Sequence, residues 1–66
     1  MQQIKATDVR RGMKMADDRG NLFKVTDVRG GFVHFDTPAG RSRSVIITYE
    51  DGLWEQVPSN STLQAA

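Results

Sequence analysis

The sequence predicts one all-β domain, an SH3-like small barrel of five strands. Two observations predict this class. Turn-forming residues, among them Gly20, Gly40 and Gly52, divide the 66-residue chain into short segments that are mostly rich in β-branched and aromatic residues. No long stretch has the spacing of an amphipathic helix. Several short strands separated by regular turns are typical of a small barrel or sandwich.

Five segments are the predicted strands, and each is bounded by a turn. Gly30 and Gly31 can adopt the positive φ angles of a tight two-residue hairpin turn, and Pro38 with Gly40 forms a second turn. The middle three strands should therefore form an antiparallel meander. The predicted strands are residues 13–16, 22–28, 32–36, 41–48 and 53–57.

Alternation along each predicted strand assigns its two faces. Phe23 and Val25 share one face, and Val28 breaks the alternation, which predicts a β-bulge near Asp27. Arg41 and Arg43 share a face with Val45 and Ile47, while Phe32, His34 and Asp36 face away from the core. The predicted core is Phe23, Val25, Val33, Phe35, Val45 and Ile47, closed by Met13 or Met15, Leu53 and Val57.

The ends of the domain follow from the same local signals. Residues 48–51 have the length of one short 3₁₀ turn before the last strand, and residues 5–11 could form a helical turn that Gly12 ends. Pro58 ends the last strand, and small polar residues follow it. We therefore expect a barrel over residues 1–57 and a flexible C-terminal tail over residues 58–66.

Two early segments resemble a known family. Residues 7–13 (TDVRRGM) and 18–25 (DRGNLFKV) are similar to the opening of the N-terminal domain of translation elongation factor P, a KOW-like member of the SH3-like barrels. The resemblance covers about the first 30 residues and implies the barrel. The family carries a functional Lys or Arg on a Gly-flanked loop after the second strand, where this chain has only Arg29 before two glycines. The translation activity is therefore not transferred.

Composition and residue inventory favour a binding protein without enzymatic activity. The chain has no Cys, 9 basic and 8 acidic residues, and a net charge of +1. No apolar stretch is long enough to span a membrane, and no secretory signal begins the chain, so we expect a cytoplasmic protein. The single histidine, His34, has no nucleophile and acid beside it, and with Asp36 it offers only two metal ligands. We therefore expect no catalytic residue, metal or cofactor.

Nucleic acid is the leading predicted partner, because basic residues gather locally despite the small net charge. Arg41 and Arg43 lie on one face of a predicted strand with no acid between Asp36 and Glu50, so they could contact successive phosphates. The competing interpretation is a hairpin kept soluble by its charge. The predicted nucleic-acid-binding residues are Arg10, Arg11, Lys14, Lys24, Arg29, Arg41 and Arg43.

A protein partner is the alternative, and self-association belongs with it. Phe32, His34, Tyr49 and Trp54 could form an exposed aromatic face that receives another chain, whereas Trp54 could instead cover the open end of the barrel. A domain with so small a core also gains stability from a second copy. Basic residues that converge without acids would favour nucleic acid, and basic residues that each lie beside an acid would favour a protein partner.

Overall fold

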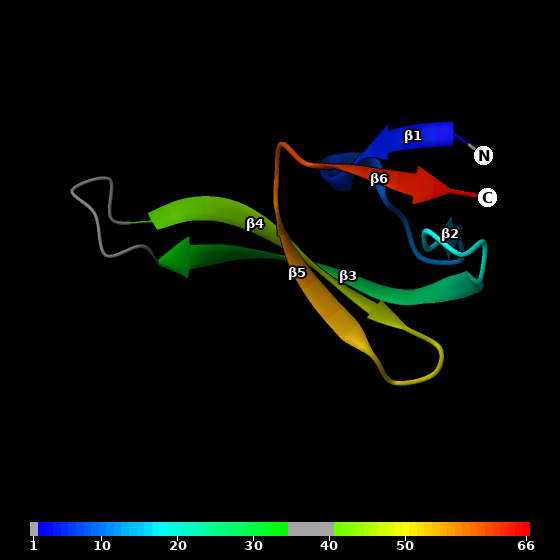
Figure 1. Ribbon diagram of the computed structural model, residues 1–66. Helices are drawn as coiled ribbons and strands as arrows, with labels where there is room; N and C mark the ends of the chain where they lie inside the picture. Colours follow the sequence, from blue (N-terminus) through cyan, green and yellow to red (C-terminus); the bar gives the residue numbers. More distant parts are fainter. Residues whose placement is uncertain (1, 35–40) are drawn as a thin grey trace.

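The computed structural model of the chain describes residues 2–34 and 41–66, which form an all-β, antiparallel sheet (Figure 1). The sheet has six strands in the order β1-β6-β2-β3-β4-β5, and within the described residues it is open, with β1 and β5 at its edges. The predicted number of five strands is therefore wrong. The elements are β1 (Gln2–Lys5), the 3₁₀ helix η1 (Ala6–Asp8), β2 (Lys14–Ala16), β3 (Leu22–His34), β4 (Arg41–Tyr49), β5 (Trp54–Pro58) and β6 (Thr62–Ala65).

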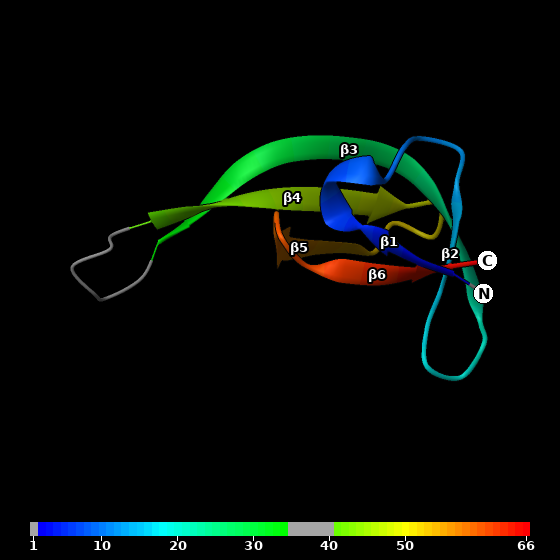
Figure 2. The same cartoon turned by 90° about the horizontal axis from the view of Figure 1, so that it is seen from above.

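Strands β3 and β4 form one long hairpin that crosses the whole molecule (Figures 1 and 2). Their register runs from Val25 opposite Tyr49 to His34 opposite Arg41, and it shifts between Val25 and Asp27. This shift confirms the predicted bulge near Asp27. One half of the hairpin packs against the other elements, and we call this half together with those elements the body. The other half, residues 30–34 and 41–44, extends away from it, and we call this part the arm.

The predicted hairpin turn at Gly30 and Gly31 is wrong, because β3 continues straight through both glycines. Gly30 lies opposite Val45 and Gly31 lies opposite Ser44, and neither glycine has a positive φ angle. Glycine is required at position 31 because neighbouring side chains approach it closely, and not because a turn needs a positive φ angle there. A Cβ there would lie 3.1 Å from Cδ1 of Ile46, so the absent side chain permits a close approach of neighbouring side chains.

Continuous pairing changes the face assigned to Phe32. After the bulge, Val28 lies opposite Ile47 and Phe32 lies opposite Arg43, so Phe32 shares the face of the core instead of facing away from it. The register confirms that Arg43 lies on the same face as Ile47. The predictions for Phe35, Asp36, and the turn with Pro38 and Gly40 lie outside the described residues, as do the side chains of Val33, His34 and Arg41.

The core lies in the body, where two layers of the curved sheet meet. Ile47, Val25 and Val9 are fully buried. Phe23 and Val57 are only partly buried, and Leu53 is exposed, so the prediction that Leu53 closes the core is wrong. The buried apolar residues are Ala6, Val9, Met15, Val25, Val45, Ile47 and Ala65; of these, the sequence predicted Met15, Val25, Val45 and Ile47.

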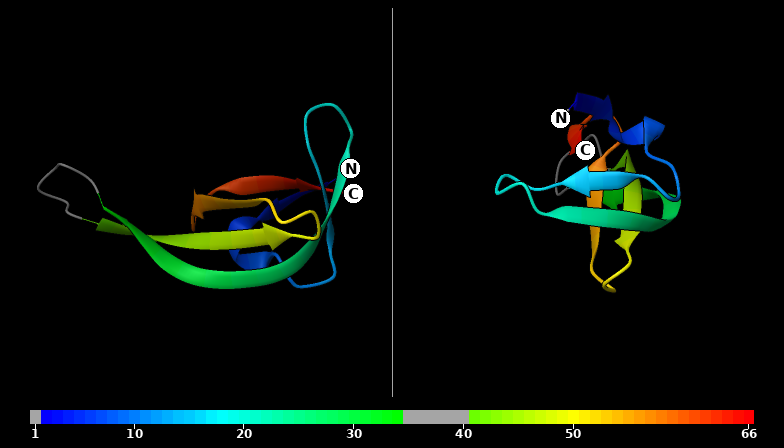
Figure 3. Two further views of the ribbon diagram at one scale, coloured as in Figure 1. Left: turned by 90° about the horizontal axis from the view of Figure 1, so that it is seen from below. Right: turned by 90° about the vertical axis from the view of Figure 1, so that its right-hand side faces the viewer.

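The segment expected to be a flexible tail, 58–66, contains strand β6. Leu63 lies opposite Ile4 of β1, and Ala65 pairs with both Gln2 of β1 and Met15 of β2, which brings the two termini side by side (Figures 1 and 3). Apolar Leu63 and Ala65 alternate with polar residues in this segment. Alternation of this kind favours a half-buried strand, and here it outweighs the small polar residues that suggested a tail.

The short turn of the 3₁₀ type that was expected at 48–51 occurs as a single hydrogen-bonded turn, not as a 3₁₀ helix. The amide of Gly52 donates a 2.9 Å hydrogen bond to the carbonyl of Tyr49, which closes a tight turn between β4 and β5. The helical element that the described residues contain is η1, within the 5–11 region where a helical turn was expected. Its first amide, Ala6, donates to the carbonyl of Ser61 at 2.8 Å, so η1 is fixed to the segment before β6.

Candidate protein-interaction surface

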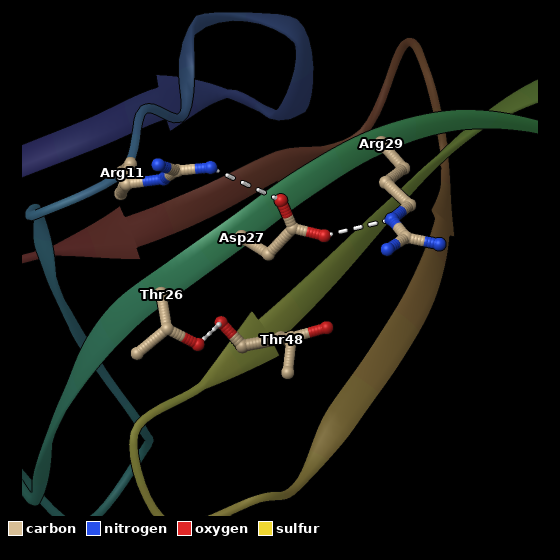
Figure 4. A network of polar contacts seen from close by, with 5 residues as sticks. All are labelled: Arg11, Thr26, Asp27, Arg29 and Thr48. Atoms are coloured by element: carbon tan, nitrogen blue, oxygen red, sulfur yellow. Dashed lines mark hydrogen bonds and ion pairs between the residues drawn. The ribbon is translucent and has the colours of Figure 1, made fainter.

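Two of the predicted nucleic-acid-binding arginines share one carboxylate (Figure 4). The guanidinium of Arg29 donates to Asp27 at 2.8 Å through Nε, and Nη2 of Arg11 lies 3.6 Å from the other oxygen of Asp27. The hydrogen bond from Arg29 and the positive charges hold the pKa of Asp27 below its ordinary value of 3.8. Asp27 therefore remains ionised at neutral pH and offsets half of the charge of this arginine pair.

The other basic residues of the body also have local roles or acidic neighbours. Arg10 donates through Nη1 to the carbonyl of Thr7 at 2.8 Å and to that of Val9 at 3.0 Å, which ties down the chain after η1. Lys14 and Lys24 lie directly opposite each other on β2 and β3. They line a wide, open hollow together with two acids of the β4–β5 turn, Glu50 and Asp51.

The basic residues therefore fall into groups with different neighbours instead of forming one acid-free surface. Arg43 belongs to neither group above, because it lies on the arm opposite Phe32. Arg41 lies opposite His34 near the described end of the arm, by the register of the backbone.

The most exposed large apolar side chains are consecutive residues at the start of β5. Trp54 is 64% exposed and Leu53 is 62% exposed. The interpretation in which Trp54 covers the end of a barrel is therefore wrong. Trp54 lies opposite Thr48, on the face of the hairpin that does not carry Ile47. Tryptophan is ordinarily largely buried, so this degree of exposure is unusual for the residue type.

A groove of about 350 Å³ lies beside these two residues. The rings of Phe23 and Tyr49 form part of its wall, with their centroids 5.8 Å apart and their planes tilted by 58°. We call this cavity the aromatic groove. Its lining includes the apolar residues Met15, Phe23, Tyr49, Leu53, Trp54 and Leu63 and the acids Asp17 and Glu55.

The acids of the aromatic groove are held in place. Asp17 accepts 2.9 Å hydrogen bonds from the amides of Arg19 and Asn21, and the side-chain amide of Asn21, the main cause, holds the pKa of Asp17 below its ordinary value. Burial raises the pKa of Tyr49 to about 12, with a further contribution from the carboxylate of Glu55, to which it is hydrogen-bonded. At neutral pH the groove therefore has a neutral phenol and the ionised carboxylate of Asp17 in its lining.

A second cavity, of about 320 Å³, lies where the arm leaves the body. Its floor is formed by Gly30, above which no atom lies within 4 Å of an added Cβ, and Phe32 and Arg43 stand at its arm side. Thr7 from η1 and Ser59 complete it from the body. We call this cavity the arm socket. The sequence did not reveal it, because its residues come from distant parts of the chain and Gly30, its floor, was interpreted as part of a turn.

No metal centre is formed by the described residues, among which no three His, Asp or Glu side chains gather. Within residues 2–34 and 41–66, no helix has the length and apolar character needed to cross a membrane. No protein-family model, curated protein or solved structure matches the chain.

Proposed function

We propose that the chain is a non-enzymatic protein-interaction module that binds a partner chain through Leu53, Trp54 and the aromatic groove. We call these parts together the turn surface. The observation that carries the proposal is the pair of adjacent, largely exposed residues Leu53 and Trp54 beside a cavity with an apolar and aromatic lining. Tryptophan is among the residue types that contribute most binding energy at protein interfaces.

The magnitude of the hydrophobic term supports a docking role. A large aromatic side chain buries about 150–250 Å² when it is covered, and each Å² of apolar surface contributes about 25 cal/mol. Covering Trp54 and Leu53 therefore provides several kcal/mol toward association. In the isolated chain both side chains are largely exposed, so covering this apolar surface stabilises only a complex with a partner.

The charges of the turn surface indicate the chemistry of the partner. Asp17 and Glu55 are the charged residues in the lining of the aromatic groove. Complementary charge steers association and suppresses wrong partners. We therefore expect a partner segment with an apolar side chain that enters the groove and a Lys or Arg that meets the carboxylates.

Nucleic acid is the less favoured partner. Phosphate binding depends on cationic side chains that release counterions, whereas Arg11 and Arg29 already share Asp27. Lys14 and Lys24 have Glu50 and Asp51 in the lining of the same hollow. Such neighbours repel phosphate and reduce the net attraction.

Two exposed leucines provide a matched test of the proposal. Leu53 and Leu22 are exposed to similar degrees, 62% and 55%, but only Leu53 lines the aromatic groove. Selection from a displayed library of random peptides should yield sequences that combine apolar residues with Lys or Arg. Calorimetry with a selected peptide should show an affinity loss of about tenfold or more, or about 1.4 kcal/mol, for Trp54→Ala and Leu53→Ala. Leu22→Ala should bind like the unaltered chain.

Titration with DNA and RNA oligonucleotides tests the other class of partner. We expect no salt-sensitive binding at micromolar protein. Binding with a log–log salt slope of about −2 to −4 would indicate two to four phosphate contacts. If that binding were lost in Arg11→Ala and Arg29→Ala and retained in Trp54→Ala, the nucleic-acid function would replace the one proposed.

The finer fold class is part of the same proposal. We infer an SH3-like barrel related to the N-terminal domain of elongation factor P, and with it a cytoplasmic location. The strand-rich chain, the long bulged β3 and the short helical turn support this inference. It requires β1 and β5, the two edges of the sheet, to approach each other. Proton–proton contacts between these strands in solution would support the barrel, and their absence would leave an open sheet.

A further inference from the structure

We propose that a second copy of this chain is a partner of the turn surface, and that the β4–β5 turn of one copy docks into the arm socket of the other. This inference rests on the proposed function, because it uses Leu53 and Trp54 as the docking residues. It adds the identity of the partner and the site that receives these residues.

The arm socket is an open depression with room for side chains. Gly30 leaves open space above the sheet, and the walls of the socket come from both the arm and the body, including Phe32, Val45 and Thr7. Its volume of about 320 Å³ is near the lower end of the range for ligand pockets, about 300–1,000 Å³. A cavity of this size accepts one or two side chains and is too small for a larger element.

The β4–β5 turn has the shape and chemistry that this socket requires. It projects from the body as a short loop (Figure 1), and its exposed residues include Leu53 and Trp54 next to the acids Glu50 and Asp51. The socket contributes the opposite charge through Arg43. A guanidinium near the face of a tryptophan ring adds a cation–π attraction to the ion pairing.

The positions of the two surfaces exclude docking within one molecule. The β4–β5 turn lies at the Tyr49 end of the long hairpin, and the arm extends from the opposite end (Figures 1 and 3). The arm socket lies at the base of the arm, where residues 30–32 and 43–45 line it. Two copies placed in opposite directions can satisfy both contacts at once. A reciprocal arrangement of this kind is a closed, twofold dimer in which the same contact occurs twice.

Cavity filling and side-chain removal test the two surfaces separately. Gly30→Val occupies the socket without a clash in the single chain, because the position has extended backbone and open space. Sedimentation velocity over a concentration series should show that the unaltered chain self-associates. Gly30→Val and Trp54→Ala should each remain folded and monomeric, while Leu22→Ala should associate like the unaltered chain.

Charge exchange tests whether these two surfaces meet each other. Arg43→Glu and Glu50→Lys should each weaken self-association at least tenfold, because each homodimer then contains two like-charge contacts. A mixture of the two variants should form a heterodimer with two attractive contacts. In one contact both charges are reversed, and in the other Glu50 faces Arg43 as in the unaltered chain. Failure of the mixture to associate would overturn the proposed pairing.

The outcome separates this inference from the proposed function. If the unaltered chain stays monomeric at its highest soluble concentration while selected peptides still bind at Trp54, self-docking is wrong and the interaction module stands. If neither peptides nor a second copy bind at Trp54, both are wrong. Self-association that Gly30→Val leaves unchanged would also overturn the socket as the receiving site.

Discussion

The body and the arm share the strands β3 and β4 but differ in what covers them. In the body, Val25 and Ile47 are fully buried because they belong to an apolar cluster that also contains residues of η1, β2 and β6. On the same face in the arm, Phe32 is 51% exposed. The pairing of β3 with β4 runs through both regions and is interrupted only by the register shift between Val25 and Asp27. The comparison shows that strand pairing shapes the arm, whereas burial of apolar surface stabilises the body.

The base of the arm is joined to β5 by side-chain hydrogen bonds as well as by strand pairing. The side chain of Gln56 on β5 donates to the carbonyl of Phe32 at 3.2 Å and to the hydroxyl of Ser44 at 2.8 Å, across the face where Gly31 has no side chain. This polar contact fixes the base of the arm to β5. The radius of gyration, 12.4 Å against about 11 Å for a compact chain of this length, is consistent with the extended shape.

Removal of residues 62–66 should have the largest effect on the body. Without β6, strand β1 loses the partner with which it is paired, and Met15 loses its contact with Ala65. We expect the shortened chain to lose its cooperative thermal transition, as measured by circular dichroism. Thr62→Ala, at an exposed position, is the control and should unfold like the full chain. If the thermal transition of the shortened chain were unchanged, residues 62–66 would not stabilise the fold, and the expectation of a flexible tail would be right.

The loss of stability on truncating one buried and one exposed side chain should distinguish a core residue from a residue of the turn surface. Ile47→Ala should destabilise the chain by about 2–5 kcal/mol, because it leaves a cavity in the core. Trp54→Ala should cost less than about 1 kcal/mol, since Trp54 is largely exposed. Urea unfolding measures both. A loss for Trp54→Ala as large as that for Ile47→Ala would place Trp54 in the core and contradict the comparison.

The two adjacent glycines provide a smaller and matched contrast at the base of the arm. An added methyl at Gly31 would crowd Ile46 at 3.1 Å and Ser44 at 3.3 Å, so Gly31→Ala should destabilise the chain by about 1–3 kcal/mol. Gly30→Ala meets open space and should be neutral or stabilising by up to about 1 kcal/mol. The denaturation midpoints of the two variants measure the difference. Equal midpoints would show that β3 does not pass through the glycines as described.

At alkaline pH, the stability of the body should depend on Tyr49. Because the pKa of Tyr49 is raised from 10 to about 12, the unfolded chain releases this proton first as the pH rises. The contribution of Tyr49 to the free energy of unfolding is complete below pH 10 and is lost between pH 10 and about 12. Tyr49→Phe should remove this part of the pH dependence in denaturant unfolding. A Tyr49→Phe variant with the same alkaline loss would show that another group is responsible.

At acid pH, Asp27 should have the smallest effect, because the Arg11 and Arg29 contacts lie at the surface. Its pKa is below the ordinary value of 3.8 in the folded chain, so its contribution is present above about pH 4 and is lost as the pH falls through the folded value. Asp27→Asn should flatten this part of the stability profile measured by urea unfolding. An unchanged profile would indicate that the arginine contacts do not stabilise the fold.

Local patterns predicted the strands of the body well. Alternation of apolar residues placed Val25, Val45 and Ile47 in the core, and the break in alternation at Val28 located the bulge. These features depend on residues close together in sequence. The same reasoning also predicted that Arg43 shares the face of Ile47.

The remaining errors arose where distant segments decide the structure. Strands β1 and β6 are too short to be recognised alone, and each is stabilised by the other end of the chain. Gly30 and Gly31 are compatible with both a tight turn and an extended strand. Pairing with β4 holds both residues in the extended strand. The turn surface could be predicted only in part, because the sequence left two positions open for Trp54. One was an exposed aromatic face, and the other was buried over the open end of a barrel.

Quenching of tryptophan fluorescence by iodide across a protein concentration series tests the central claim most directly, because Trp54 is the only tryptophan in the chain. At low concentration, Trp54 should be readily quenched, and at high concentration it should become protected in the unaltered chain but not in Gly30→Val. Protection at the lowest concentration would contradict the account, because Trp54 would then belong to the core. Quenching that stays strong at every concentration would remove the second copy as its partner.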